Sequence, residues 1–546
     1  MGNENRTFRI HQVKLSLGES KDAIPTKITR MLGMKNLKID NWEIVRESLD
    51  ARKKANICWV YSVDFSVLPY DIEKKLSSNM SKYKLEEAVK SDYVLPKTEV
   101  GSAELEDRPV VVGFGPGGML AGLILAQAGY APIILERGSD VDTRTKQVEE
   151  FWRDGVLDVN SNVQFGEGGA GTFSDGKLTT GIKDQRIRKV LEELVKAGAP
   201  DDILYKQKPH VGTDVLRSVV KNIRQEIISL GGTVLFNKRV DTIILEGSQI
   251  KGIMVKTTAT NREEQAREQD EEIIPCQAAI FAIGHSARDT FRELNRKGVV
   301  MNPKPFSLGV RIQHPQELID CSQYGAPAQV LGLPPAEYKI NHRCDNGRGV
   351  YSFCMCPGGE VIVASSQEKA VTTNGMSYHK RDSGLANSAL LCDVRPEDFG
   401  SNHPLGGVDF QEKYERLAFI NGGENYKPPT ATWGELRDGK APHVEKTLPP
   451  FVVEAFKEAM PHLGRKLQGF DRDDSMIFAV EARSSSPVRF ERNERLEGAM
   501  YLRDGSKTVL EGLYPCGEGA GFAGGIMSAA VDGIRAAESI IKNYSK

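Results

Sequence analysis

The 546-residue sequence has no strong charge of either sign and no long hydrophobic run. Its 72 Lys and Arg against 74 Asp and Glu leave a net charge of −2, which excludes the basic footprint of a dedicated nucleic-acid binder. No run of about 18 or more apolar residues occurs, so no membrane-spanning segment is expected. The N-terminal MGNENRTFRI lacks the apolar core of a secretory signal. A soluble, cytoplasmic protein is therefore expected.

Cysteine is also scarce, with eight residues spread without the spacing of a disulfide scaffold. We expect mostly reduced, buried thiols. The only close pair is Cys354 and Cys356, which could be a redox dithiol or half of a metal site. A C-x-C disulfide ring is strained, and no second Cys or His pair lies at zinc spacing, so buried structural thiols are favoured. The histidines are scattered singly along the sequence, and no metal site is predicted.

Glycine, by contrast, is in excess: 53 residues, about 10% of the chain against an average of about 7%. The pattern G-x-G-x-x-G occurs three times, over residues 113–118, 166–171 and 519–524. The pattern alone is weak evidence. A dinucleotide-binding turn also needs a strand before it, a helix after it, and an acidic residue at the end of the next strand.

Only the first cluster meets all three conditions. It stands in RPVVVGFGPGGMLAGLILAQAGYAPIILERG, which is typical of a βαβ unit. Gly113 permits the tight turn, Gly115 lets the backbone approach a pyrophosphate, and Gly118 lets helix and strand pack closely. The helix N-terminus offers free N–H groups to the phosphates. Glu136 is the expected ribose acceptor, and its charge would repel a 2′-phosphate, so the sequence predicts FAD or NAD.

The third cluster distinguishes between these two dinucleotides. Only 22 residues follow Gly524, too few for a second complete dinucleotide domain. The segment LYPCGEGAGFAGGIMSAAVDGIRAAESII resembles the C-terminal motif of flavoproteins of the glutathione-reductase superfamily, in which a helix N-terminus lies beside the flavin ring. Such an N-terminus stabilises the negative charge of reduced flavin. Glu518 represents the usual acidic residue beside these glycines.

Two further segments are expected near the same ligand. NVQFGEGGAGTFSDGKLTTG has no strand and helix in the required order, so we interpret it as a loop whose N–H and hydroxyl donors suit the pyrophosphate or the flavin edge. A plain surface loop is the alternative. QAAIFAIGHSARDT resembles the alanine-rich strand that ends near FAD in the same superfamily, with Ala282, Gly284 and His285 at its tip. The predicted cofactor-binding residues are Gly113, Gly115, Pro116, Gly117, Gly118, Glu136, Arg137, Gly171, Thr172, Ser174, Asp175, Lys177, Val240, Ala282, Gly284, Gly517, Glu518, Gly525 and Ile526.

The length predicts three or four domains or subdomains. Residues 1–92 read as a small α+β domain, and its basic run at residues 51–54 is interpreted as a charged turn rather than a nucleic-acid patch. Residues 93–107 form a linker. A FAD-binding domain takes residues 108–305 and 475–546, and a β-rich substrate domain takes residues 306–474.

The segments GFGPGG, GEGGAGTFSDGKL, FCMCPGG, EARSSSPVR and CGEGAGFAGGI together resemble the bacterial FAD-dependent proteins often called NAD(FAD)-utilising dehydrogenases, which belong to the glutathione-reductase superfamily. The resemblance covers residues 105–546, and the N-terminal α+β domain with its LDARKK segment also looks like that group. It implies an α/β fold: a glutathione-reductase-type, Rossmann-like FAD domain interrupted by a β-rich substrate domain, plus the small N-terminal domain.

The implied activity is that of a FAD-dependent oxidoreductase, a dehydrogenase or reductase, with NADH or NADPH as candidate transient electron donors. Flavin carries out the electron chemistry itself, so no catalytic triad is required. Disulfide reduction by a Cys pair near the first glycine helix is excluded, because no Cys lies between Cys58 and Cys276. Arg311 and His314 could reach a substrate anion from one strand, and Arg483 and Ser485 are similar candidates, although salt bridging explains such arginines as well.

Two alternatives stay open. One is a flavin-dependent RNA-modifying or RNA-binding protein that uses residues 1–92, since residues 1–100 hold 18 basic against 14 acidic residues. The other is a flavin-binding protein without turnover. The sequence does not specify the small-molecule substrate or the oligomeric state.

Overall fold

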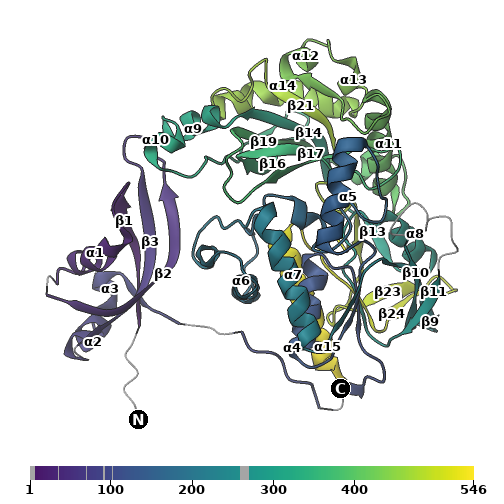
Figure 1. Ribbon diagram of the computed structural model, residues 1–546, viewed down its shortest axis with the longest axis horizontal. Coiled ribbons are helices and arrows are strands. Elements are labelled where there is room, and N and C mark those ends of the chain that lie inside the picture. The colour runs from purple at the N-terminus through teal and green to yellow at the C-terminus, as the bar shows by residue number, and fades with distance from the viewer. Residues whose placement is uncertain (1–6, 35, 69, 90–92, 101, 259–269) are drawn as a thin grey trace.

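The computed structural model describes residues 7–34, 36–68, 70–89, 93–100, 102–258 and 270–546. The chain is a mixed α/β protein built around three main sheets, and Figure 1 shows the N-terminal sheet standing apart from the other two. Within the described residues, no helix is both long and apolar enough to cross a membrane.

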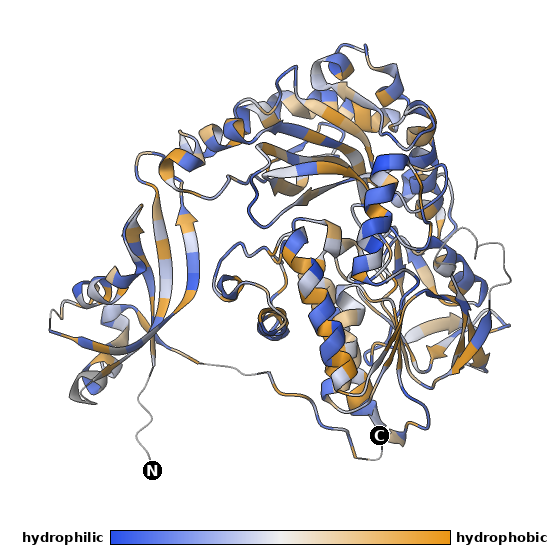
Figure 2. Ribbon diagram, in the orientation of Figure 1, coloured by the Kyte–Doolittle hydropathy of each residue, from blue (hydrophilic) through white to orange (hydrophobic). Residues whose placement is uncertain are grey.

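The N-terminal unit is an antiparallel sheet in the order β2-β3-β1-β4 with helices packed on it. Its strands alternate between hydrophobic and hydrophilic residues, as expected of a sheet with one buried face (Figure 2). Residues 51–56 form the turn between β2 and β3, where Arg52 pairs with Asp50, so the basic run is a charged turn. The elements are β1 (Phe8–Ser16), α1 (Ile24–Met31), β2 (Lys38–Asp50), β3 (Cys58–Leu68), α2 (Tyr70–Ser77), α3 (Met80–Tyr83) and β4 (Leu85–Glu87).

The linker that follows runs along the C-terminal helix. Tyr93 donates a hydrogen bond to Glu538, and the N–H of Glu99 donates to the carbonyl of Lys542. β5 (Ala103–Glu104) then pairs in parallel with β26 (Tyr544–Ser545). The two ends of the main body are thereby joined.

The second sheet is parallel and has the order β25-β12-β6-β7-β8. One face packs against helices that include α4, α7 and α15. Of these, α4 is buried along nearly its whole length, as its uniformly apolar sequence requires. The other face packs against an antiparallel meander of β9, β10 and β11 and against α8. The elements are β6 (Val110–Val112), α4 (Pro116–Gln127), β7 (Ile133–Leu135), α5 (Val141–Asp154), α6 (Arg186–Lys196), α7 (Thr213–Ser229), β8 (Thr233–Leu235), β9 (Lys238–Glu246), β10 (Gln249–Thr257), β11 (Glu271–Pro275), β12 (Ala279–Phe281), α8 (Arg288–Arg296), β25 (Leu513–Pro515) and α15 (Ile526–Asn543).

The third sheet is antiparallel and has the order β15-β16-β19-β14-β21-β20. It shares a large apolar core with helices that make this region less purely β than the sequence indicated. The elements are β14 (Phe306–Pro315), α9 (Gln316–Tyr324), α10 (Ala328–Leu331), β15 (Asn341–Arg343), β16 (Gly349–Pro357), β17 (Gly359–Val363), β18 (Thr373–Ser377), β19 (Leu385–Val394), α11 (Gly406–Asn421), β20 (Thr430–Thr432), α12 (Trp433–Arg437), α13 (Pro442–Glu445), α14 (Pro450–Lys466) and β21 (Met476–Glu481).

The end of the substrate domain predicted at residue 474 does not coincide with the end of this sheet. β21 lies beyond it, yet pairs with β14 along Gly309–Gln313. The difference arises because β21 follows a long helical excursion and its partner strand is more than 150 residues earlier. Short two-stranded pairs complete the fold: β13 (Met301–Pro303) with β22 (Val488–Phe490), and β23 (Gly498–Tyr501) with β24 (Lys507–Leu510).

Candidate functional site

A pocket opens where the strands of the parallel sheet end. β6, β7, β12 and β25 are followed by Gly113, Glu136, Ala282 and residues 516–517, and because the strands are parallel, their carboxyl ends meet at one edge. The opposite wall of the pocket comes from the third sheet and the β17–β18 hairpin, through Cys354, Asn374 and Glu481. The pocket therefore lies between two units of the fold.

The first glycine cluster forms a tight turn on the pocket floor. Gly113 has φ +94°, and a Cβ added there would collide with the carbonyl oxygen of Ala282. A Cβ on Gly118 would likewise collide with the carbonyl of Gly113, so Gly118 supports the turn. A Cβ on Gly115 would meet nothing nearer than the Cα of Gly169 at 3.7 Å. Gly115 thus leaves room for a ligand rather than for protein.

Glu136 ties together the backbone around this turn. One of its oxygens accepts a hydrogen bond from the N–H of Phe114 at 2.8 Å. The other accepts from Gly138 and Gly166 at 3.0 and 2.9 Å. A carboxylate can accept about four hydrogen bonds, so one position remains for a ligand hydroxyl. The sequence predicted the ligand role but not these three protein contacts.

Two cationic or basic nitrogens in the pocket wall have no hydrogen-bond partner. They are the buried Nζ of Lys177 and Nε2 of His285. Lys177 lies 3.5 Å from the carboxylate of Asp175, and Nδ1 of His285 lies 3.2 Å from Glu518. Buried polar atoms without partners are rare in folded proteins, so both nitrogens indicate a polar ligand.

The start of α15 borders the same pocket. Its first-turn N–H groups have no partners within the helix, and they carry the positive end of the helix dipole. Gly524, Gly525 and Ile526 line the pocket here, and a Cβ at either glycine would have no atom within 4 Å. The glycine turn near residue 113 and the helix start near residue 526 therefore face one cavity.

The structure brings most of the predicted cofactor-binding residues to this pocket. Two do not line it: Gly118 packs beneath the turn, and Thr172 is buried with its hydroxyl donating to the carbonyl of Glu167. The predicted residues that line the pocket are Gly113, Gly115, Pro116, Gly117, Glu136, Arg137, Gly171, Ser174, Asp175, Lys177, Val240, Ala282, Gly284, Gly517, Glu518, Gly525 and Ile526.

Arg311 does not line the pocket but lies behind its wall. Its guanidinium donates to Glu481 at 3.1 Å, to the carbonyl of Cys354 at 2.7 Å and to Asn374 at 3.0 Å. The side chain is fully buried, and a Cβ on Gly375 would crowd it. Arg311 therefore positions three residues of the wall instead of contacting a substrate anion, which corrects the sequence prediction.

His314 and Ser485 are also away from the pocket. His314 is buried, its Nε2 lies 2.8 Å from the carbonyl of Phe470, and its ring stacks on that side chain. Burial lowers the pKa of His314, so the ring is neutral. Ser485 is half-buried and its carbonyl accepts a hydrogen bond from Gln411. Alternation along a strand predicted their side-chain direction but not the elements that cover them.

Arg483 is the predicted catalytic candidate that does reach the pocket. It forms two hydrogen bonds with Glu415, at 2.9 and 2.7 Å, and also bonds Ser286 and Ser366. Burial alone would raise the pKa of Glu415, but the guanidinium groups of Arg288 and Arg483 outweigh it and lower that pKa to about 2. Arg483 is thus held rigidly at the pocket edge.

Glu481 is a pocket residue that sequence reasoning missed. Burial raises its pKa to about 7, although Arg311 partly opposes this effect. A carboxyl group with such a pKa can both hold and release a proton near neutral pH. The segment EARSSSPVR, which Glu481 begins, does not indicate this role, because the burial of Glu481 depends on the distant strands β14 and β18.

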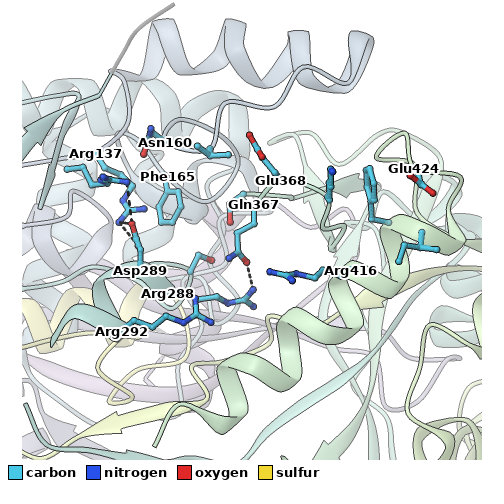
Figure 3. A pocket seen from close by; sticks show the side chains of 17 residues that line it. Arg137, Asn160, Phe165, Arg288, Asp289, Arg292, Gln367, Glu368, Arg416 and Glu424 are labelled. Carbon is cyan, nitrogen blue, oxygen red and sulfur yellow. Dashed lines mark hydrogen bonds and ion pairs between the residues drawn. The ribbon is translucent and has the colours of Figure 1, made fainter. Parts of the chain in front are cut away.

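A second cavity of about 800 Å³ adjoins the first and shares Arg137, Phe165 and Ser286 with it. Figure 3 shows arginines from α8 and α11 around it, with Arg137 directed at Asp289 and Arg288 at Gln367. Arg292 pairs with Glu412 and Asp409. Most of the positive charge in this cavity is therefore already balanced by neighbouring carboxylates.

Outside both cavities, three side chains of the kinds that bind metal ions lie close together. Ligand atoms of His342, Cys344 and Glu458 lie within 4.8 Å of one another, at the end of β15 and on α14. The sequence predicted no metal site, and the separation of Glu458 from the other two hides this group from a spacing search.

Comparison with known proteins places the chain in a family. Residues 305–484 match the family described as FAD-dependent protein, C-terminal domain-like. Residues 7–66 match a domain of unknown function. The chain is 45% identical over 557 residues to an uncharacterized protein of Clostridium beijerinckii, covering 98% of this chain and 99% of that protein. The two proteins belong to one family.

Among solved structures, similarity extends to flavin-dependent brominase Bmp2, at 14% identity over 80% of this chain and 78% of that chain, with a TM-score of 0.36. It also extends to a geranylgeranyl bacteriochlorophyll reductase-like protein of Thermoplasma acidophilum, at 13% identity over 81% and 79% of the two chains, with a TM-score of 0.33. TM-scores this low do not establish a shared fold.

Proposed function

We propose that the chain is a FAD-dependent oxidoreductase, a dehydrogenase or reductase, whose FAD lies in the pocket between the parallel sheet and the third sheet. One observation carries the proposal. The glycine turn after β6 and the start of α15, about 400 residues apart, line the same pocket, and each brings a helix N-terminus to it.

The residues present fit an adenine dinucleotide. Gly115 and the α4 N-terminus would hold the pyrophosphate, and Glu136 has an acceptor position left for a ribose hydroxyl. The α15 N-terminus would face the flavin ring, where it favours negative charge. These assignments imply the glutathione-reductase-type arrangement that the sequence resembles.

FAD when bound supplies hydride or electron transfer, and the protein supplies binding, orientation and electrostatics. Nζ of Lys177 and Nε2 of His285, which have no hydrogen-bond partner in the protein, are available to polar atoms of the ring or of a substrate beside it. Glu481 can hold or give up a proton at the pocket wall. Arg483, fixed by Glu415, offers a positive charge that needs no reorganisation on binding.

NADH or NADPH is the proposed transient electron donor. Among the described residues, the parallel sheet has one strand–helix–strand unit with a glycine turn, β6-α4-β7, in which the turn lies between β6 and α4. FAD would occupy it, so the nicotinamide would dock directly against the flavin rather than in a fold of its own.

The purified protein tests the proposal through its visible spectrum. Oxidised-flavin absorbance, released as FAD on denaturation, is expected, followed by anaerobic bleaching with NADH or NADPH. Flavin absorbance that neither NADH nor NADPH bleaches would refute the proposed electron donor but not the proposed binding of FAD. Absence of flavin even after FAD is added would refute the proposed function.

A further inference from the structure

Cys354 and Cys356 lie in a bulge of β16 that faces the pocket. The pairing of β16 with β19 shifts between Phe353 and Cys356, and Cys354 has φ +43°. Such bulges redirect a side chain at the edge of a site. Cys354 lines the pocket and is half-buried, whereas Cys356 is buried behind it. Both thiols are free.

The bulge also brings the two cysteines into direct contact. The thiol of Cys356 donates to the carbonyl oxygen of Cys354 at 3.4 Å. A hydrogen bond from Cys356, together with Arg311 and Lys177, lowers the pKa of Cys354, while the same contact and burial raise the pKa of Cys356. One sulfur is therefore set up as a thiolate and the other as its proton-bearing partner.

A second observation points to a ligand at this place. The buried Nζ of Lys177, which lines the same pocket, has no hydrogen-bond partner. The guanidinium of Arg311 holds the bulge from behind through the carbonyl of Cys354. The wall is thus held where the thiol meets the pocket, and the ammonium of Lys177, 3.5 Å from the carboxylate of Asp175, keeps its hydrogen-bond donors for a ligand.

The other cysteines lack these features. Cys392, on neighbouring β19, is fully buried, and burial raises its pKa to about 12. Cys321 is exposed on α9, outside the residues that line the pocket. Only the C-x-C pair combines a second thiol, a nearby cation and access to the pocket among the eight cysteines, all of which are described.

We propose that Cys354 and Cys356 form a second two-electron redox centre that exchanges electrons with the bound FAD. This rests on the proposed function, because FAD is the electron donor. In the forward step the Cys354–Cys356 S–S bond breaks and the disulfide takes two electrons and one proton from reduced FAD. Cys354 leaves as a thiolate, Cys356 takes the proton, and FAD is left oxidised, so atoms and charge balance.

The strain of a C-x-C ring favours this step. A strained disulfide is more easily reduced than a relaxed one, which favours electron transfer from flavin to the cysteines. The dithiol then reduces an oxidised substrate that enters the pocket. This differs from disulfide reductases, whose Cys pair lies near the first glycine helix, where this chain has none.

The test counts electrons in the full-length holoprotein. The protein is oxidised with diamide, freed of reagent and titrated anaerobically with dithionite. Wild type is expected to take up about four electrons per FAD, two for flavin and two for the disulfide. Cys354→Ser and Cys356→Ser are expected to take up about two. Cys321→Ser, a matched control far from the pocket, should match wild type.

Peptide mapping of the oxidised protein gives a readout that does not depend on flavin. A Cys354–Cys356 disulfide is expected in wild type, and faster iodoacetamide labelling of Cys354 than of Cys392 in the reduced protein. Uptake of two electrons by flavin-containing wild type, or no mapped disulfide, would overturn the redox centre and leave the proposed function intact. A mapped disulfide in protein that binds no FAD would refute both the exchange and the proposed function.

Discussion

Gly533 on α15 packs directly against Gly117 at the start of α4. A Cβ on Gly533 would collide with the carbonyl oxygen of Gly117. This contact places the C-terminal helix against the turn that follows β6. It also explains a glycine in the interior of a long helix, where glycine by itself costs about 1 kcal/mol relative to alanine.

Gly533→Ala should therefore destabilise the protein although it improves helix propensity. We expect a loss of about 2–4 kcal/mol in the free energy of unfolding, and release of FAD, because α4 and α15 must move apart. Denaturant unfolding and FAD content measure the two effects. Unchanged or increased stability would show that the helices are not packed as described.

Gly524→Ala is the matched control at the other end of the same segment. A Cβ there has no protein atom within 4 Å and projects toward the pocket. Stability of the apoprotein should stay within about 0.5 kcal/mol of wild type, while FAD affinity falls. Wild-type FAD affinity in this variant would remove the start of α15 from the cofactor site.

Glu136→Gln should weaken both the fold and the cofactor site. The amide replaces one acceptor oxygen by an NH₂ group, so either the N–H of Phe114 or the N–H groups of Gly138 and Gly166 lose their acceptor. A loss of about 1–3 kcal/mol is expected in the apoprotein, in addition to weaker FAD binding. Thermal unfolding with and without FAD separates the two. An apoprotein as stable as wild type would mean that the backbone contacts of Glu136 contribute little.

Glu415 should make stability depend on pH in acid. Its pKa in the folded protein is about 2, below its ordinary value of 4.5. Because the folded pKa is the lower one, its contribution is complete above about pH 4.5 and is lost as the pH falls toward 2. Glu415→Gln leaves Arg288 and Arg483 without their carboxylate, so a cost of about 3–5 kcal/mol is expected at pH 7. The gap between the two proteins should narrow in urea unfolding below pH 4.5, and a constant gap would contradict the assignment.

His314→Gln should affect stability and not electron transfer. The ring is neutral, buried and bound to the carbonyl of Phe470, away from the pocket. We expect a loss of about 1–3 kcal/mol in unfolding free energy and a wild-type rate of flavin reduction in stopped-flow absorbance. A changed rate in a fully flavinated variant would restore His314 as a candidate for substrate binding.

The N-terminal unit should be dispensable for FAD binding. All described residues that line the proposed FAD pocket lie between Val112 and Ala529. The unit has its own core. It meets the main body through backbone hydrogen bonds of Glu47 with Tyr205 and Gln207, and through Ile57, which packs into the core of the third sheet. A chain of residues 93–546 should therefore contain FAD as wild type does. Loss of flavin from a folded truncated chain, as judged by circular dichroism, would contradict this.

Local features of the fold could be predicted from the sequence. The β6-α4-β7 unit follows from a β-branched run, a glycine turn and an apolar helix within about 30 residues. The long helix α7 and the hairpin of β9 and β10 follow from similar short-range patterns. Each depends on contacts between chain neighbours, which periodicity reports directly.

Long-range pairings could not be predicted in the same way. The placement of β21 beside β14, the burial of Arg311 against Glu481, and the meeting of Cys354 with Lys177 each join segments far apart in the chain. The sequence predicted which of these side chains are charged and that some of them alternate along a strand. Only the packing of other elements decided which side chains face the pocket and which are covered.

FAD binding to the purified apoprotein is the most direct test of the account. Titration followed by flavin fluorescence should give one tight FAD per chain in wild type. It should also give much weaker binding in Gly115→Ala, whose added Cβ has no protein atom nearer than 3.7 Å and so acts on the ligand alone. No binding by wild type, or equal binding by the variant, would contradict the placement of FAD over the glycine turn.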